Sequence, residues 1–262
     1  MRREMSVNGS FYPQSDEEIK KYFKHFSKIY DENFQLPKLK SRAVIVPHAG
    51  YIYSGYTANI AYRVLQNSPI KNLVVIGPSH RVGFKGVSIC DYKSYDTPFG
   101  DVQSANDLYD KLKNEFSFKC LENSHAEHST EVQFPFIKYY LPKANIVELV
   151  YSDTDAYDIS KIIDFVLAQD DCGVIISTDL SHFYNLDDAN KLDNVCLAAI
   201  NNLDIDLLDD GCEACGMIGV KAMLLSAKKL NLNTTIFDYR TSADVSNDET
   251  RVVGYTSACF HK

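Results

Sequence analysis

Residues 73–80 read Leu73-Val74-Val75-Ile76-Gly77-Pro78-Ser79-His80, and this stretch decides the fold. An apolar run leads into a short turn that ends on a histidine. The same plan occurs in Ala43-Val44-Ile45-Val46-Pro47-His48 and in Gly173-Val174-Ile175-Ile176, which leads into residues 177–182. Near-continuous apolar runs of this length are typical of strands that are buried on both faces. They predict a parallel or mixed sheet covered by helices.

Helical patterns separate these strands. Ser15-Asp16-Glu17-Glu18 has the form of a capping box and predicts a helix over residues 16–32. Asn145–Val150 is a fourth expected strand, and Thr234–Tyr239 and Arg251–Phe260 are two more around a polar loop. Further helices are expected at Gly55–Leu65, Ala105–Glu115, Glu131–Tyr140, Ala156–Ala168, Asp187–Asn201 and Gly216–Leu230. This alternation predicts an α/β fold with a mixed, largely parallel central sheet flanked by helices, in a single domain over residues 1–262.

The composition excludes several classes of protein. Of the 262 residues, 45% are hydrophobic and 24% are charged, as in soluble globular proteins. The 27 Lys and Arg against 35 Asp and Glu give a formal charge of −8, and the basic residues are scattered, so we expect no nucleic-acid partner. No apolar run reaches the roughly 18–20 residues that cross a bilayer, and no apolar stretch follows the basic start. We therefore expect a cytoplasmic protein with no membrane partner.

The chain has seven cysteines and seven histidines, the residue types that most often bind transition metals or carry redox chemistry. An odd cysteine count without a signal peptide favours reduced thiols over a disulfide framework. We expect small buried apolar side chains at Cys90, Cys120, Cys172, Cys196 and Cys259. The pair Cys212 and Cys215 is a weak signal for zinc or redox chemistry, because there is no second such pair. Cys215 lies at the start of an expected helix, a position that lowers the pKa of a thiol and favours the thiolate.

His48 and His80 occupy equivalent positions, each just past an expected strand. Ligands of α/β sheets bind beyond the carboxyl ends of the strands. A neutral imidazole on a rigid turn is a good ligand for iron, copper or zinc. The alternative is two unrelated loop histidines, but their equivalent placement favours a shared site.

Two other segments carry titratable groups. His182 follows Asp179 by three residues, so the carboxylate either fixes the histidine or caps the next helix. The segment from His125 to Glu131 contains His128 and leads into an expected helix. Its histidines are three residues apart instead of the four that zinc peptidases use, so capping of the helix by this segment is the alternative.

Taken together, these motifs identify a family resemblance. The chain resembles the Memo family, also known as the AmmeMemoRadiSam system protein B family, over nearly all of its 262 residues. The motifs occur in order along the chain: Gly9–Pro13, Pro47–Tyr51, Gly77–His80, Glu127–Phe136, Ser177–His182, Ala214–Gly216 and Val252–Tyr255. Two positions depart from the family pattern. Met217 follows Cys215-Gly216 in a region where relatives often have a proline, and Arg81 stands where some relatives have a second histidine.

The resemblance implies a fold similar to that of the class III extradiol dioxygenases, which contain non-haem iron. It implies that His48 and His80 are metal ligands and that Cys215 is the third, where the dioxygenases have a Glu. Asp179 would be an outer or fourth ligand, and His182 and His128 would transfer protons. A site of two imidazoles and one thiolate suits iron or copper redox chemistry better than the ring cleavage of the carboxylate enzymes.

The resemblance also implies alternatives. Eukaryotic Memo proteins are associated with motility signalling and phosphotyrosine peptides, so a non-enzymatic peptide-binding module is one of them, although no cluster of arginines is visible. A zinc-dependent hydrolase is another. The family name implies a radical-enzyme partner, and the substrate, a small molecule or a peptide, stays unidentified. Tyr12, Tyr51, Tyr53 and Tyr184 lie near the motifs and are candidates for an aromatic pocket wall.

Overall fold

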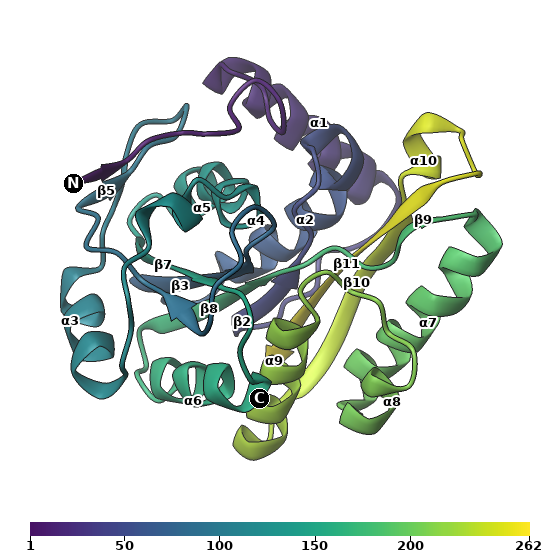
Figure 1. Ribbon diagram of the computed structural model, residues 1–262. Coiled ribbons are helices and arrows are strands. Elements are labelled where there is room, and N and C mark those ends of the chain that lie inside the picture. Colours follow the sequence, from purple (N-terminus) through teal and green to yellow (C-terminus); the bar gives the residue numbers. More distant parts are fainter.

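The computed structural model describes all 262 residues as layers of helices around a central sheet (Figure 1). The strands are β1 (Arg2–Arg3), β2 (Ser41–Val46), β3 (Asn72–Pro78), β4 (Val87–Ser88), β5 (Ser94–Tyr95), β6 (Val102–Gln103), β7 (Asn145–Tyr151), β8 (Cys172–Ser177), β9 (His182–Tyr184), β10 (Asn233–Thr241) and β11 (Val252–His261). The helices are α1 (Asp16–Asn33), α2 (Tyr51–Leu65), α3 (Asn106–Glu115), the 3-10 helix η1 (Glu122–His125), α4 (His128–Glu131), α5 (Gln133–Tyr140), α6 (Ala156–Leu167), α7 (Leu186–Asn202), α8 (Ile205–Asp209), α9 (Met217–Leu230) and α10 (Ala243–Ser246).

The central sheet is parallel in the middle and antiparallel at its edges. β2, β8, β3 and β7 lie side by side in that order and pair in parallel. β11 and β10 continue antiparallel beyond β2, β4 pairs antiparallel with β7, and β9 pairs with β11. β1, β5 and β6 form a small separate sheet. The predicted α/β class, with a mixed, largely parallel central sheet flanked by helices, is confirmed.

The alternation of side chains along the central strands explains the two helical layers. Along β3, Val74 and Ile76 belong to an apolar core shared with α6 and α9, whereas Leu73 and Val75 belong to a second core shared with α1, α2 and α5. Both faces of the strand are therefore buried, which is why its sequence is a continuous apolar run. Each such side chain contributes about 1.5–3 kcal/mol to stability when fully buried. Figure 1 shows α1, α2 and α5 on one side of the sheet and α6 and α9 on the other.

The expected helices form, with small shifts at their ends. α1 begins where predicted, because the side chain of Ser15 accepts a hydrogen bond from the Glu18 amide. α2 begins at Tyr51, four residues before the prediction, because the Gly50 carbonyl accepts bonds from the amides of Tyr53 and Ser54. None of the helices combines the length and apolar character that crossing a bilayer requires.

The expectation that all thiols are reduced is wrong. Cys90 is bonded to Cys120 and Cys196 to Cys212, and in each pair the Cα atoms lie 4.7 Å apart. An odd total of seven is compatible with two disulfides, because three thiols remain free. The predicted burial of Cys172 and Cys259 as free thiols is confirmed. Disulfides are typical of oxidising compartments and of intracellular proteins of hyperthermophiles, so cysteine usage no longer favours a reducing compartment.

Candidate metal centre

The carboxyl ends of the parallel strands bring the candidate residues to one edge of the sheet. His48 lies two residues beyond β2, His80 two residues beyond β3, and Asp179 two residues beyond β8. β2 and β8 are in register at their ends, where Val46 pairs with Ser177. This register places Asp179 beside His48, whose backbone N–H donates to the Asp179 Oδ1 over 2.7 Å.

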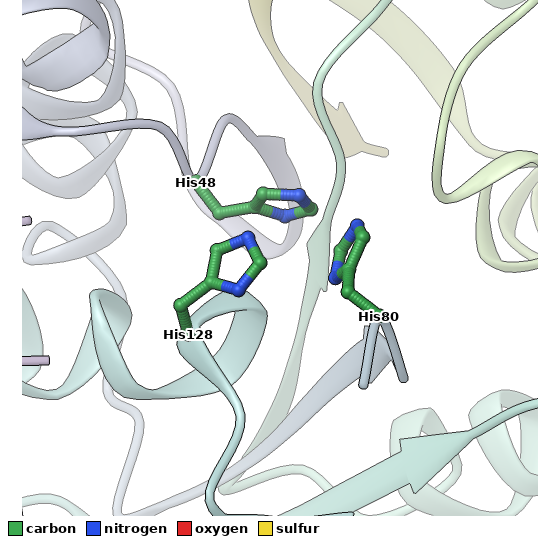
Figure 2. A group of neighbouring side chains, drawn as sticks. All are labelled: His48, His80 and His128. Carbon is green, nitrogen blue, oxygen red and sulfur yellow. The ribbon is translucent and has the colours of Figure 1, made fainter. Parts of the chain in front are cut away.

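Three imidazoles converge at this edge. One ring nitrogen from each of His48, His80 and His128 lies within 4.8 Å of those of the other two. The ring centroids are 5.1 Å apart for His48 and His80, 5.3 Å for His48 and His128, and 4.5 Å for His80 and His128. Figure 2 shows the three rings facing a common space. His48 is buried, whereas 30% of the His80 side chain is exposed, so the site opens to solvent beside His80.

One buried carboxylate orients two of these rings. Glu127 precedes α4, and its Oε1 accepts hydrogen bonds from the Nδ1 of His80 at 3.1 Å and of His128 at 2.8 Å. It also accepts from the backbone amides of His80 and Ser129. Burial alone would raise the pKa of the Glu127 carboxyl group, but these bonds outweigh it and hold the pKa well below its ordinary value. Because Nδ1 donates in both rings, each Nε2 keeps its lone pair, as a metal ligand requires.

The third ring is held by a hydroxyl group. The Ser177 Oγ donates to the Ser129 carbonyl at 2.5 Å, so towards the His48 Nδ1, 3.0 Å away, it acts as an acceptor. The His48 Nε2 therefore also keeps its lone pair. Burial, together with the neighbouring His80 and His128, lowers the pKa of His48 well below its usual value. His48 is thus a neutral imidazole at physiological pH.

Cys215 adds a sulfur atom to the group. Its Sγ lies 3.2 Å from the His48 Nε2, and it accepts a hydrogen bond from the Asp179 amide over 3.2 Å. Burial and the nearby Asp179 carboxylate raise the pKa of this thiol to about 12. The expectation that a helix start lowers this pKa is therefore wrong, because Cys215 lies two residues before α9 and its partial burial disfavours the charged thiolate. A cation is needed here to stabilise the thiolate.

Asp179 and His182 lie beside the three imidazoles without joining them. The Asp179 Oδ2 is 3.9 Å from the His48 Nε2, and burial raises the pKa of this carboxyl group. His182 begins β9 and is close enough for its charge to affect the pKa values of both His48 and Asp179. Asp179 therefore anchors the loop of His48, and His182 stands at the edge of the site.

The donor set fits a transition-metal ion. Three imidazoles face one another, the Cys215 sulfur lies beside one of them, His48, and imidazole and thiolate are ligands of iron, copper and zinc. Each Nδ1 rests on a carboxylate or hydroxyl oxygen, as is usual for histidines that bind metals.

The chain matches the Memo-like protein family over residues 3–259. The chain belongs to the Memo family.

Its curated relatives match it over nearly their whole length and carry the family name. A MEMO1 family protein of Thermoplasma volcanium is 31% identical, with 98% of this chain and 97% of the relative covered. One from Aquifex aeolicus is 31% identical, with 98% of both chains covered. Another, from Methanobrevibacter smithii, is 32% identical and covers 99% of this chain and all of its own.

In this Memo-family chain an aromatic cavity lies beside Phe11, the residue whose ring contacts His128. The centroids of the Phe11 and His128 rings lie 4.6 Å apart. Phe11 also lines a cavity of about 370 Å³. The cavity is lined by Gly9, Ser10, Phe11, Tyr12, Pro13, Tyr22, Gly50, Tyr51, Ile52 and Tyr53. The expected aromatic wall therefore includes Tyr12, Tyr51 and Tyr53. Tyr184 is not part of it; its hydroxyl group donates to Glu213 on the surface.

Glu127 is the residue that the sequence prediction missed. The sequence indicated a role for it at the helix start, and it does accept a bond from the Ser129 amide. Its second role, orienting the imidazoles, depends on His80, which is 47 residues away in the chain. The only local sign of this role was that Glu127 precedes His128 directly in the sequence. Helix capping also explains a carboxylate at that position.

Proposed function

We propose that this protein is a metal-dependent redox protein that binds iron or copper through His48, His80 and Cys215. The observation that carries the proposal is the convergence of three imidazoles, one of which, His48, has the Cys215 Sγ 3.2 Å from its Nε2. We add His128 to these donors, and the position of its Nδ1 beside the same carboxylate as that of His80 supports this addition. A metal ion bound there would exchange electrons with a substrate or with oxygen.

The surrounding residues have separate tasks. Glu127 holds two imidazoles in the tautomer that binds metal, and Asp179 fixes the backbone of His48. His182 is half-buried at the edge of the site and is free of carboxylate partners. It is the group that transfers protons between the site and solvent, since an imidazole can act as acid or base near neutral pH.

Metal loading tests this proposal directly. The purified protein is loaded with Fe²⁺ or Cu⁺ under anaerobic conditions, and bound metal and oxygen consumption in the presence of a reductant are measured. We expect about one metal ion per chain, and loss of both signals in the His48→Ala, His80→Ala double variant. A His25→Ala, His261→Ala variant is the control, because it also removes two imidazoles but leaves the site intact. Unchanged binding and oxygen consumption in the first variant would refute the proposal.

Zinc-dependent hydrolysis is a second candidate, supported by the third imidazole. Three histidines that leave a position open are the ligand set of some catalytic zinc sites, in which the ion activates a water molecule. Zinc at one ion per chain, with ester or amide turnover and no oxygen consumption, would favour it. Peptide binding that persists in the metal-free protein would instead favour a binding module.

A further inference from the structure

The N-terminal segment, residues 3–12, is bonded to a single buried carboxylate of α4. Glu131 accepts hydrogen bonds from the backbone amides of Ser6 and Val7 at 2.8 Å and from the Tyr12 hydroxyl group at 2.8 Å. It also forms an ion pair with Arg3, whose NH1 lies 2.6 Å from its Oε2. Glu131 and Arg3 are both almost fully buried. These contacts hold residues 3–12 against α4.

Arg3 bridges the two ends of α4. Its guanidinium group donates to Glu131 at the end of the helix and, over 3.2 Å, to the backbone carbonyl of Glu127 at its start. The Glu127 side chain is the one that orients His80 and His128. The Arg3 Nε is 3.9 Å from Glu148, whose carboxylate is bonded to Thr130 in the middle of α4. One planar side chain therefore supports the turn that presents His128.

Phe11 connects the same segment to the loop of His48. Its carbonyl accepts a hydrogen bond of 2.8 Å from the Tyr51 amide, at the first residue of α2 and three residues after His48. Its ring lies against the His128 ring, with centroids 4.6 Å apart. The segment thus contacts both of the loops that carry these two histidines, although it contributes no ligand of its own.

We propose that Arg3 is a positioning residue of the metal centre and that residues 3–12 form a clasp that sets the spacing of His48 and His128. The part of this inference that concerns metal affinity rests on the proposed function. The part that concerns the two loops is independent of any metal. Residues that hydrogen-bond to the ligands of a metal typically change metal affinity by about 10- to 100-fold when they are replaced, and Arg3 acts on such a residue through the backbone of Glu127.

Arg2 offers a matched control for the test. It is next to Arg3 in sequence, but its side chain is 44% exposed and its guanidinium group is paired with Asp96 and Asp101 at the surface. The variants are Arg3→Ala, Arg3→Lys and Arg2→Ala. Lysine keeps the charge beside Glu131 but lacks the planar fork that reaches Glu127 at the same time, so it separates positioning from charge. It also provides a milder variant if Arg3→Ala does not fold.

Hydrogen exchange in the metal-free protein is the first measurement. We expect Arg3→Lys to speed exchange at residues 127–132 and 49–54 relative to the wild type, with α6 and α9 unchanged, and Arg2→Ala to change neither region. Equal exchange in Arg3→Lys and the wild type would overturn the clasp. A uniform increase over all four regions would also overturn it, because it would show that Arg3 serves only global stability.

Cobalt binding is the second measurement, made with Co²⁺ as the probe and read from its absorption spectrum. We expect Arg3→Lys to bind Co²⁺ about 10- to 100-fold more weakly than Arg2→Ala and to alter the spectrum, because the His128 donor is displaced. Wild-type affinity and spectrum in Arg3→Lys would overturn the positioning role. If the wild type itself binds no Co²⁺, Fe²⁺ or Cu⁺, the proposed function fails, while hydrogen exchange still decides the clasp.

Discussion

Replacing Glu127 by glutamine tests how the metal centre is organised. The wild-type carboxylate accepts four hydrogen bonds: Oε1 faces the Nδ1 atoms of His80 and His128 and the Ser129 amide, and Oε2 faces the His80 amide at 2.7 Å. A glutamine has one acceptor oxygen. If it takes the place of Oε1, the side-chain NH₂ group meets the His80 amide, donor against donor. At least one buried N–H therefore loses its partner.

The expected magnitudes follow from these contacts. A lost hydrogen bond to a charged group costs about 1.5–3 kcal/mol of stability. Loss of the carboxylate that orients two ligands is expected to weaken metal binding about 10- to 100-fold, or about 1.4–2.7 kcal/mol. The assays are urea unfolding of the metal-free protein and Co²⁺ titration against a competing chelator. Glu122→Gln is the control, because Glu122 is exposed in the same segment. Wild-type metal affinity in Glu127→Gln would refute the orienting role of this carboxylate.

The same variant has a characteristic pH dependence. The pKa of Glu127 is lower in the folded protein than the ordinary 4.5, so below that pH the unfolded chain binds a proton that the folded chain does not. Its contribution to stability is complete above about pH 4.5 and is lost as the pH falls towards the folded pKa. In Glu127→Gln, the free energy of unfolding should fall less steeply below about pH 4.5, by up to about 1.4 kcal/mol per pH unit. An unchanged slope would contradict the low pKa.

Three further outcomes are expected. Cys215→Ser should abolish the thiolate-to-cobalt absorption band while leaving residual Co²⁺ binding to the imidazoles; a band that persists would show that the sulfur is not a ligand. Thiol titration of the unfolded protein should find three thiols before reduction and seven after it, whereas seven before reduction would contradict the disulfides. Gly254→Ala should cost more than about 2 kcal/mol in urea unfolding, because a Cβ there overlaps the buried Asp193 carboxylate; Gly83→Ala, where nothing lies within 4 Å, should be almost neutral, and equal effects would refute this steric argument.

Much of the fold was predictable because its central strands are buried on both faces. The predicted strands at residues 43–46, 73–76 and 173–176 lie within β2, β3 and β8. Their side chains alternate between the two apolar cores. The start of α2 was less predictable, since it depends on a hydrogen bond from Tyr51 to Phe11, which lies 40 residues earlier. The disulfides were missed for a similar reason. Cysteine pairing depends on distance in space, and the count of seven carries no information about it.

The sequence by itself determined the layered α/β architecture, the family and the placement of His48, His80 and Asp179 after strands. These properties are local, because apolar runs select buried strands and parallel strands bring their carboxyl ends to one edge. Only the tertiary structure decided that Glu127 holds both His80 and His128, that the Cys215 thiol is desolvated beside His48, and that Arg3 supports α4. Glu127 and His80 are 47 positions apart, Arg3 and Glu127 are 124 apart, and His48 and Cys215 are 167 apart. These contacts depend on how the chain packs, and no local pattern of residues encodes them.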